Sequence, residues 1–260
     1  MESDPSVVRV LSRALDVIRC FGPDANSMSL SEVAEAAGLP RATARRLLTT
    51  LTTLGYARME DDRFVLAPRV LELGMAYLHS TNLWEIVRPN LVRLVRKTGE
   101  SSSVAQLDGS DIVYVARVAV PKLVSLSVTI GTRFPAVQTS LGKVLLADLE
   151  PDELEHALNT PSRSPVHPRL EPARNEIYQE LTAIKERGWS SADEELAPGI
   201  RSIAAAIHGA SGRVVAAVNV TVQAAETPMI ALRKYHLPLL LNTARDISSD
   251  WTAWHPPASR

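Results

Sequence analysis

The chain has 260 residues, 45% of them hydrophobic, and a formal net charge of −1. This length suits two domains, and the apolar content is enough for two cores. The charge near zero excludes a protein that attracts nucleic acid non-specifically. A single cysteine, Cys20, excludes an internal disulfide and is consistent with a reducing compartment. No segment has the length needed to span a bilayer and no signal peptide is recognised, so we expect a cytoplasmic protein without a membrane partner.

The first elements along the chain predict a helix followed by a helix-turn-helix. Apolar residues at helical spacing predict a helix over residues 7–21. Ser29 and Glu32 form the S-x-x-E pattern of a capping box, so a second helix begins after Ser29. Gly38 permits a tight turn, and Pro40 stands at the start of a third helix, where its missing N–H is not needed.

The third helix carries arginines and threonines on the side away from its apolar stripe. The stripe consists of Ala44, Leu47, Leu48, Leu51 and Leu54. In a helix-turn-helix the second helix lies in the major groove, where Arg reads guanine and Thr meets a base edge or a thymine methyl. The residues that we assign to DNA on this helix are Arg41, Ala42, Thr43, Arg45, Arg46 and Thr49. The alternative is an ordinary solvated helix face.

A two-stranded hairpin over residues 56–59 and 64–66 follows, as in a winged helix-turn-helix. Arg58 and Arg63 could reach phosphates from this wing. Pairing of both arginines with the acidic residues of the turn is an equally good interpretation. Residues 1–80 contain nine arginines, no lysine and ten acidic residues, so the DNA-facing charge is expected to be a local patch on one helix.

The segment after the hairpin predicts a linker helix. From Pro68 the apolar residues cover more than one face of a helix, which is typical of burial on several sides. We expect this helix to pack against its own domain and a partner subunit, whereas the alternative is burial within one domain. A further helix over residues 82–99 is expected to kink or restart at Pro89.

The rest of the chain mixes strands and helices. The predicted strands cover residues 102–107, 112–118, 123–130, 202–208 and 214–222. The predicted helices cover residues 139–149, 151–158, 173–187 and 229–249, with Pro238 interrupting the last. This order predicts an α+β domain built on an antiparallel sheet with helices at its sides. The expected division is a DNA-binding domain at 1–67, a linker helix at 68–82 and a C-terminal domain at 83–260.

A candidate small-molecule site lies where a loop leads into the helix that begins at Thr139 or Ser140. A helix N-terminus offers free N–H groups and a positive dipole end, which favour an anion. Ser140 adds a hydroxyl, and Gly142 lets a ligand come close. The segment is not a P-loop, because no Ser or Thr follows Lys143 and Val137 stands at the place of the first glycine. We therefore predict a carboxylate site; the alternative is a normally capped helix.

Catalytic chemistry has little support in the sequence. The acidic run at 193–195 is expected to be solvated, and the scattered histidines lack metal-ligand spacing. No nucleophile elbow is found. We predict no catalytic residue, no metal and no cofactor, although an enzyme acting at Ser140 or near Glu194 stays open.

Motifs along nearly the whole chain resemble the IclR family of bacterial transcriptional regulators. The segments that carry the resemblance are residues 14–17, 30–34, 54–56, 131–143, 187–189 and 199–205. Within that family the chain is most similar to regulators of protocatechuate, 4-hydroxybenzoate and β-ketoadipate catabolism. This closer similarity is carried by residues 100–104, 107–118 and 131–136.

The resemblance implies an N-terminal winged helix-turn-helix, a linker helix and a GAF-like effector-binding domain. It implies dimers that pair through the N-terminal part, often assembled into tetramers, and a small carboxylate effector. By position, the effector residues would be Ser140, Leu141, Ile200, Ser202, Asn219 and Thr221. Some relatives place an acidic residue near Ala192, so the polar contacts here would differ, and a larger or aromatic acid would suit the less charged pocket.

Our main hypothesis is a regulator of aromatic-acid catabolism that binds double-stranded operator DNA and responds to a small carboxylate. One alternative is an IclR-type regulator of another carboxylic-acid pathway. The other is a GAF-type sensor that does not bind DNA directly.

Overall fold

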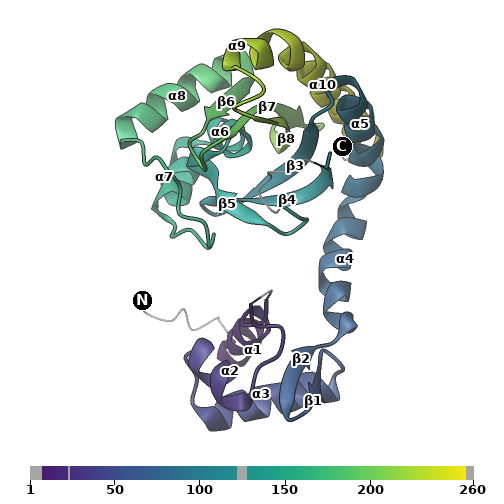
Figure 1. The fold of residues 1–260 in the computed structure, drawn as a ribbon, viewed down its shortest axis with the longest axis vertical. Helices are drawn as coiled ribbons and strands as arrows, with labels where there is room; N and C mark the ends of the chain where they lie inside the picture. Colours follow the sequence, from purple (N-terminus) through teal and green to yellow (C-terminus); the bar gives the residue numbers. More distant parts are fainter. Residues whose placement is uncertain (1–7, 23, 122–127, 256–260) are drawn as a thin grey trace. The chain divides into compact units, whose positions relative to one another are not determined.

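The computed structural model describes residues 8–22, 24–121 and 128–255. The chain divides into two compact units, one ending at Thr81 and the other beginning at Asn82 (Figure 1). The first unit contains α1 (Arg9–Arg19), α2 (Leu30–Ala36), α3 (Arg41–Thr53), β1 (Ala57–Glu60), β2 (Arg63–Leu66), η1 (Pro68–Val70) and α4 (Leu71–Thr81). The second contains α5 (Leu83–Thr98), β3 (Ser101–Asp108), β4 (Asp111–Val118), β5 (Arg133–Pro135), η2 (Ala136–Gln138), α6 (Ser140–Ala147), α7 (Pro151–Asn159), α8 (Arg174–Arg187), β6 (Trp189–Asp193), β7 (Ile200–His208), β8 (Val214–Gln223), α9 (Met229–Ala231), η3 (Leu232–His236) and α10 (Leu237–Trp254).

The predicted helix-turn-helix is confirmed in the first unit. The Ser29 N–H donates to Glu32 Oε2 at 2.6 Å and the Glu32 N–H donates to Ser29 Oγ at 3.3 Å, so the capping box starts α2. Gly38 has φ +62° in the turn, and α3 begins directly after Pro40. The buried stripe of α3 is Ala44, Leu47, Leu48 and Leu51, as predicted. Leu54 is 52% exposed instead, because the helix ends one residue before it.

The hairpin forms the predicted wing with a tighter turn. Strand β1 pairs antiparallel with β2 in a register that places Glu60 opposite Arg63. The turn is therefore Asp61-Asp62 alone, with φ values of +46° and +61°. Two successive residues with positive φ match the right-handed twist of the flanking strands.

None of the residues of helix α4 is buried. Leu71 is 70% exposed, Leu73 50% and Met75 42%. The alternative of a helix buried within one domain is therefore wrong, and so is the expected packing of α4 against its own domain, because the apolar faces have no cover within their own unit. The expected contact with a partner subunit stays a prediction.

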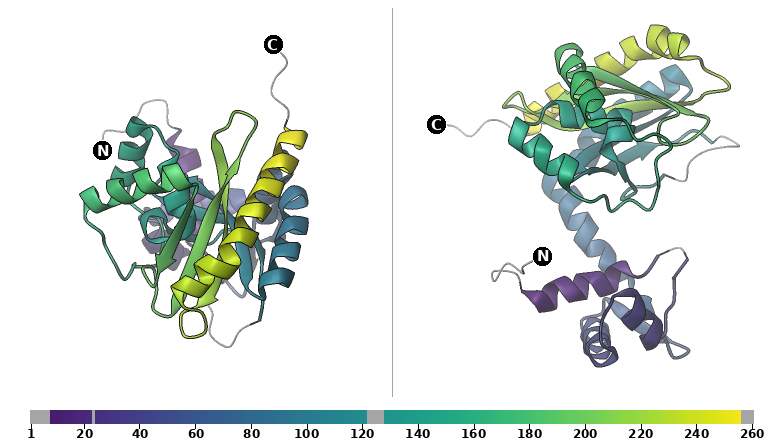
Figure 2. Two further views of the ribbon diagram at one scale, coloured as in Figure 1. Left: turned by 90° about the horizontal axis from the view of Figure 1, so that it is seen from above. Right: turned by 90° about the vertical axis from the view of Figure 1, so that its left-hand side faces the viewer.

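The second unit confirms the predicted α+β architecture. Its six strands form one antiparallel sheet in the order β5-β4-β3-β8-β7-β6. Helices α5 and α10 cover one face, and α6 and α8 lie on the other (Figure 2). Because both faces of the central strands are covered, β3, β7 and β8 are buried on both sides over most of their length.

Alternation along β7 assigns its side chains to the two layers. Ile203, Ala205 and Ile207 pack with α5 and α10, whereas Ala204 and Ala206 belong to the cluster around α6. Alanine leaves little volume above the sheet, so α6 lies close to the strands. All eight residues of α6 are buried, which explains why its sequence is apolar on nearly every side.

The edges of the sheet differ from the prediction. Most of the strand predicted at 123–130 lies outside the described residues, and residues 128–130 form no strand. The edge next to β4 is instead the three-residue β5. The opposite edge is β6, which the sequence did not predict, because its sequence WSSAD lacks the β-branched alternation of a typical strand.

Two prolines act differently from one another. Helix α5 runs from Leu83 to Thr98 without a restart at Pro89, whose position on the exposed face leaves the freed carbonyl group open to water. The final helical segment is divided as expected near Pro238: a π-helical turn, η3, ends at His236, and α10 begins at Leu237. No helix in the described part of the chain combines the length and the apolar character required to cross a membrane.

The start of α6 is fixed by a close backbone contact. An added Cβ at Gly142 would lie 2.2 Å from the Ala136 carbonyl oxygen and 2.3 Å from the Ala136 Cα. Both atoms belong to the backbone of η2 and cannot move aside as a side-chain end can. Glycine is therefore required for η2 to pack against α6.

We expect Gly142→Ala to lower the free energy of unfolding by about 1–3 kcal/mol, because the methyl group must push η2 away from α6. The measurement is urea unfolding followed by circular dichroism. The matched control is Gly74→Ala in α4, where the added methyl group meets nothing within 4 Å. An unchanged midpoint for Gly142→Ala would contradict this assignment.

Candidate functional site

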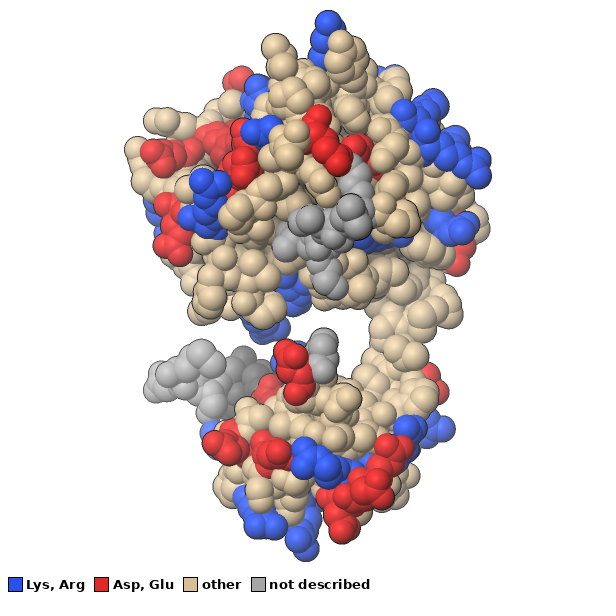
Figure 3. All heavy atoms as spheres, viewed as in Figure 1, with Lys and Arg blue, Asp and Glu red and all other residues tan. Residues whose placement is uncertain are grey.

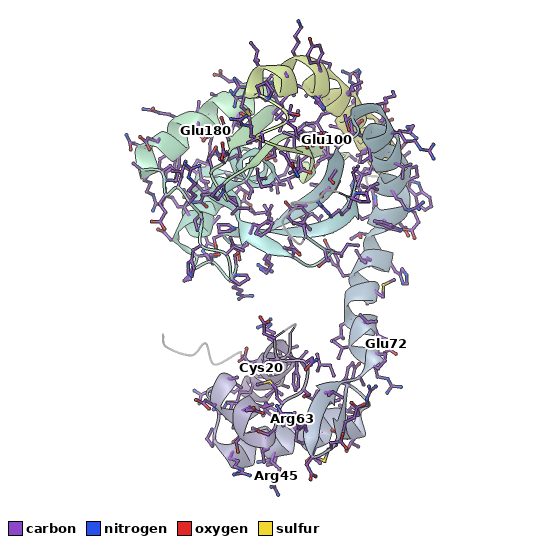
Figure 4. The ribbon with its side chains drawn as sticks, in the orientation of Figure 1. Cys20, Arg45, Arg63, Glu72, Glu100 and Glu180 are labelled. Carbon is purple, nitrogen blue, oxygen red and sulfur yellow. The ribbon has the colours of Figure 1, made fainter. Side chains whose placement is uncertain are left out.

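The outward face of α3 presents three arginines that the rest of the chain does not engage. Arg41, Arg45 and Arg46 are exposed, and within the described residues none of their guanidinium groups forms a hydrogen bond or an ion pair. Arg45 points away from the body of the first unit (Figure 4), and basic side chains gather over this end of the unit (Figure 3). Ala42 and Thr49 are also exposed, and Thr43 is half-buried. The predicted set therefore shares one accessible face of one helix.

The two wing arginines are held by their own unit. Arg58 Nε donates to Glu60 Oε1 at 2.7 Å, which is the acidic pairing that the sequence left open. Arg63 instead reaches the capping box, with Nη2 2.8 Å from Glu32 Oε2, and donates to the Ser27 carbonyl oxygen at 2.8 Å. Hydrogen bonds from the Ser29 N–H and hydroxyl, together with Arg63, lower the pKa of Glu32. Arg63 thus has a structural role that links β2 to α2.

A cavity of about 70 Å³ lies between the sheet and the start of α6 in the second unit. A cavity needs roughly 10–15 Å³ of this kind of volume to hold one water molecule. The space can therefore hold about five waters, which together have roughly the volume of a single substituted aromatic ring. The predicted effector residues Ser140, Leu141, Ile200, Ser202, Asn219 and Thr221 all line it. Gly142 does not line it. The expectation that Gly142 lets a ligand approach is corrected, because its Cα faces Ala136.

Polar side chains form the floor of the cavity in cross-strand rows. The register places Thr221 beside both Ser101 and Ser202, and Ser202 beside Ala192. Ser202 Oγ lies 2.7 Å from Ser140 Oγ, which ties the floor to the start of α6. Ala192 stands in this row, so the position where some relatives carry an acid does line the cavity.

The α6 start keeps free donors toward this floor. Thr139 Oγ1 accepts the Gly142 N–H at 3.0 Å, and the Thr139 carbonyl accepts the Lys143 N–H at 3.0 Å. The N–H groups of Ser140 and Leu141, at the first two helical positions, have no intrahelical partner. They give the start of α6 a positive dipole end at the lining residues Ser140 and Leu141, and the carboxylate site predicted there stays a prediction.

A second cross-strand pair brings a cation, Arg117, to the cavity, and the sequence did not predict it. Arg117 lies opposite Ser103 and donates from Nη1 to Ser103 Oγ at 2.9 Å. Burial lowers the pKa of Arg117, although its guanidinium stays charged, and among the described residues no carboxylate pairs with it. The missed signal was a single arginine within the otherwise apolar strand at 112–118.

Aromatic rings complete the wall beside Arg117. Tyr114 and Phe134 stack edge to face with ring centroids 5.7 Å apart, and both line the cavity. Burial raises the pKa of Tyr114 to about 12, so its hydroxyl remains neutral. A cation next to two rings suits a ligand that is both anionic and aromatic.

The acidic run after β6 has two different functions. Asp193 and Glu194 pair with Arg201, and the Glu194 carboxylate also accepts the Gly199 N–H at 2.8 Å, so these groups hold the turn. Glu195 instead lines the cavity. No histidine occurs in the described lining, and no group of metal-ligating residues is found in the described part of the chain.

Comparison with known proteins decides the family. The helix-turn-helix domain of IclR matches residues 10–61, and the C-terminal domain of bacterial IclR transcriptional regulators matches residues 75–249. The chain belongs to the IclR family. The Pca regulon regulatory protein of Pseudomonas putida is 36% identical over 245 residues, covering 94% of this chain and 84% of the relative.

Two solved structures extend the IclR comparison. A transcriptional regulator from Rhodococcus sp. RHA1 is 46% identical with a TM-score of 0.81, and the match covers 95% of this chain and 100% of that chain. The inducer-binding domain of a PobR double mutant from Acinetobacter, in complex with 3-hydroxybenzoic acid, is 28% identical with a TM-score of 0.57. That match covers 63% of this chain and 96% of the domain.

Membership of the IclR family makes this protein a DNA-binding transcriptional regulator. The alternative of a sensor that lacks a DNA-binding function is therefore wrong. The relatives are regulators and not enzymes, and the Ser140 hydroxyl is engaged by Ser202 rather than by a base. Arg117, Tyr114 and Glu195 are among the lining residues that the sequence did not assign to the effector site.

Proposed function

We propose that this IclR-family regulator controls genes of aromatic-acid catabolism in the cytoplasm and responds to a single-ring aromatic carboxylate. The observation that carries the proposal is Arg117, a half-buried cation without a carboxylate partner among the described residues, beside Tyr114 and Phe134. The relative from Pseudomonas putida regulates a Pca regulon, and the Acinetobacter domain binds 3-hydroxybenzoic acid. The first relative supports the class of pathway, and the second structure, of a double mutant, supports an aromatic acid as the effector.

Two groups in the cavity could hold the carboxylate. The start of α6 offers the N–H groups of Ser140 and Leu141, whose dipole is equivalent to about half a charge. Arg117 carries a full charge in a partly desolvated place, where an ion pair gains more than it would in water. We therefore assign the carboxylate to Arg117 and further ligand oxygens to the α6 start, Ser202, Asn219 and Thr221.

We also propose that α3 reads the operator. Its unengaged Arg41, Arg45 and Arg46 face outward, where the second helix of a helix-turn-helix enters the major groove. Arg58 and Arg63 lie in the wing and would contact phosphates while they keep their ion pairs with Glu60 and Glu32. A ligand that binds one arrangement of the paired reading helices better than another would shift operator affinity.

A homodimer, or a tetramer built from it, is the proposed assembly. Besides α4, helix α1 exposes Val8, Val10 and Leu11 by 67%, 67% and 61%. Helix α1 packs on the core of its unit through Val17, but this end of it and α4 carry apolar side chains that the unit leaves uncovered, and a two-fold axis covers such surfaces by pairing identical patches. Dimerisation also places two reading helices on successive major grooves.

For DNA binding, we expect Arg45→Ala and Arg46→Ala each to weaken binding to the protein's own upstream intergenic DNA by about tenfold or more. An arginine that contacts phosphate would also make the salt dependence shallower by about one unit of slope. The measurement is a mobility-shift titration at several salt concentrations. Arg19→Ala is the control, since Arg19 is an exposed arginine on α1. Unchanged binding by both variants would refute the reading helix.

For the effector, we expect Arg117→Gln to reduce 4-hydroxybenzoate affinity by roughly 10- to 100-fold, because the charged hydrogen-bond donor is lost. Isothermal titration calorimetry measures the affinity, with protocatechuate and β-ketoadipate as comparison ligands. Arg187→Gln is the control, since Arg187 is also partly desolvated but stacks on Trp189 outside the cavity. Full affinity in Arg117→Gln would move the carboxylate to the α6 start, and binding of β-ketoadipate alone would favour another carboxylic-acid pathway.

For assembly, we expect Leu11→Glu and Leu73→Glu to shift the protein toward the monomer, because each buries a charge in the proposed interface. Sedimentation velocity measures the effect over a range of protein concentrations. Leu170→Glu, at a residue 47% exposed in the second unit, is the control. An oligomer that survives both changes would place the interface elsewhere.

A further inference from the structure

A buried lysine joins three segments around the cavity. Lys143 is only 4% exposed on α6, and its Nζ donates to Glu180 Oε1 on α8 and to Glu195 Oε1 after β6, each at 2.9 Å. Figure 4 marks Glu180 on α8. The side chain of Glu180 is 39% exposed and that of Glu195 is 19% exposed. Two carboxylates thus share the Lys143 ammonium, and Glu180 also interacts with Arg187 on the same helix.

Only one of these two carboxylates belongs to the cavity. Glu195 lines it together with its neighbour Leu196, whereas Glu180 does not, and Glu195 is the single acidic side chain in the described lining. Burial raises the pKa of Glu195 and the Lys143 ammonium works in the opposite direction. The oxygens of Glu195 keep lone pairs beyond those used by Lys143, since a carboxylate offers about four acceptor sites.

The two charged side chains of the cavity, Arg117 and Glu195, come from elements that are far apart in the strand order of the sheet. Arg117 is on β4 and Glu195 follows β6, and three strands, β3, β8 and β7, separate β4 from β6. A ligand carboxylate at the Glu195 end would meet an acid of like charge in a partly dry site. The carboxylate therefore belongs at Arg117, and a ligand group that reaches the Glu195 end faces an acceptor that requires a donor.

A hydroxyl group on the ring can satisfy both the acceptor Glu195 and the N–H donors at the start of α6. It can donate its hydrogen to Glu195 while its oxygen accepts from the free N–H groups at the start of α6. Ser140 lies one turn before Lys143, so both features come from the same helix. A ligand that lacks the hydroxyl would displace water from Glu195 and leave the lone pairs that Lys143 does not use without a donor, which is how a polar site rejects a close analogue.

We propose that Glu195, held by Lys143, reads a hydroxyl group on the ring at the meta or para position from the effector's carboxylate. The inference rests on the proposed function, since it assumes that an aromatic acid occupies the cavity. It adds a specificity-determining residue and narrows the effector from benzoates in general to hydroxybenzoates.

The test compares four ligands on the full-length wild-type protein near neutral pH by calorimetry: benzoate, 3-hydroxybenzoate, 4-hydroxybenzoate and 4-fluorobenzoate. We expect at least one hydroxybenzoate to bind about tenfold or more tightly than benzoate, the size of a hydrogen bond to a charged group. 4-Fluorobenzoate, which has a similar shape but no donor, is expected to bind like benzoate. Equal affinity for all four ligands would overturn the inference without any variant.

Two matched variants distinguish recognition of the ring hydroxyl by Glu195 from a purely structural role of the ion pairs with Lys143. Glu195→Gln keeps an acceptor for Lys143 but removes the charge, and we expect the ratio of hydroxybenzoate affinity to benzoate affinity to fall by about fivefold or more. Glu180→Gln removes the other carboxylate on Lys143 outside the cavity and is expected to keep the preference. Equal loss in both variants, or none in Glu195→Gln, would overturn the inference alone. Absence of binding by all four acids to the wild type would overturn the proposed function and this inference together.

Discussion

The close approach of η2 to α6 is the constraint on which the second unit depends. Gly142 has no room for a Cβ beside the Ala136 backbone, and Ala204 and Ala206 keep the sheet surface low beneath the helix. This packing leaves α6 buried on all sides with its N-terminus directed at the polar floor. The free N–H groups, the Ser140–Ser202 contact and the reach of Lys143 to Glu195 all follow from the position of this one helix.

The charged residues of this chain divide by whether the fold uses them. Arg63 joins the wing to the capping box, and Arg133 joins the buried Asp111 to the β4–β5 edge. The arginines on the outer face of α3 have no such partner within the described residues. A surface arginine without a partner contributes little to stability, so the fold does not account for these three, and their place on the second helix of the helix-turn-helix is what supports the proposed DNA contact.

The cavity shows the same distinction within a protein interior. Partial burial of a guanidinium that has no carboxylate partner among the described residues, and of a carboxylate in an apolar cavity, is unfavourable unless something compensates. Arg117 lies on β4 and Glu195 follows β6, and no ion pair joins these two described residues. A ligand with an acidic end and a hydroxyl end satisfies both groups, which connects the polarity of the effector to the topology of the sheet.

The sequence alone determined the features that depend on local chemistry: the capping box at Ser29, the turn at Gly38, the stripe of α3, the central strands and the start of α6. The sequence predicted that Glu195 is a solvated acid and that Gly142 lets the ligand approach, and it did not identify Arg117 or β6. Only the tertiary structure decided these, because each depends on cross-strand register or on a backbone contact between segments. Ser202 and Asn219 came from family resemblance, and their place beside Ser140 and Ser103 is set by strand pairing that no local pattern encodes.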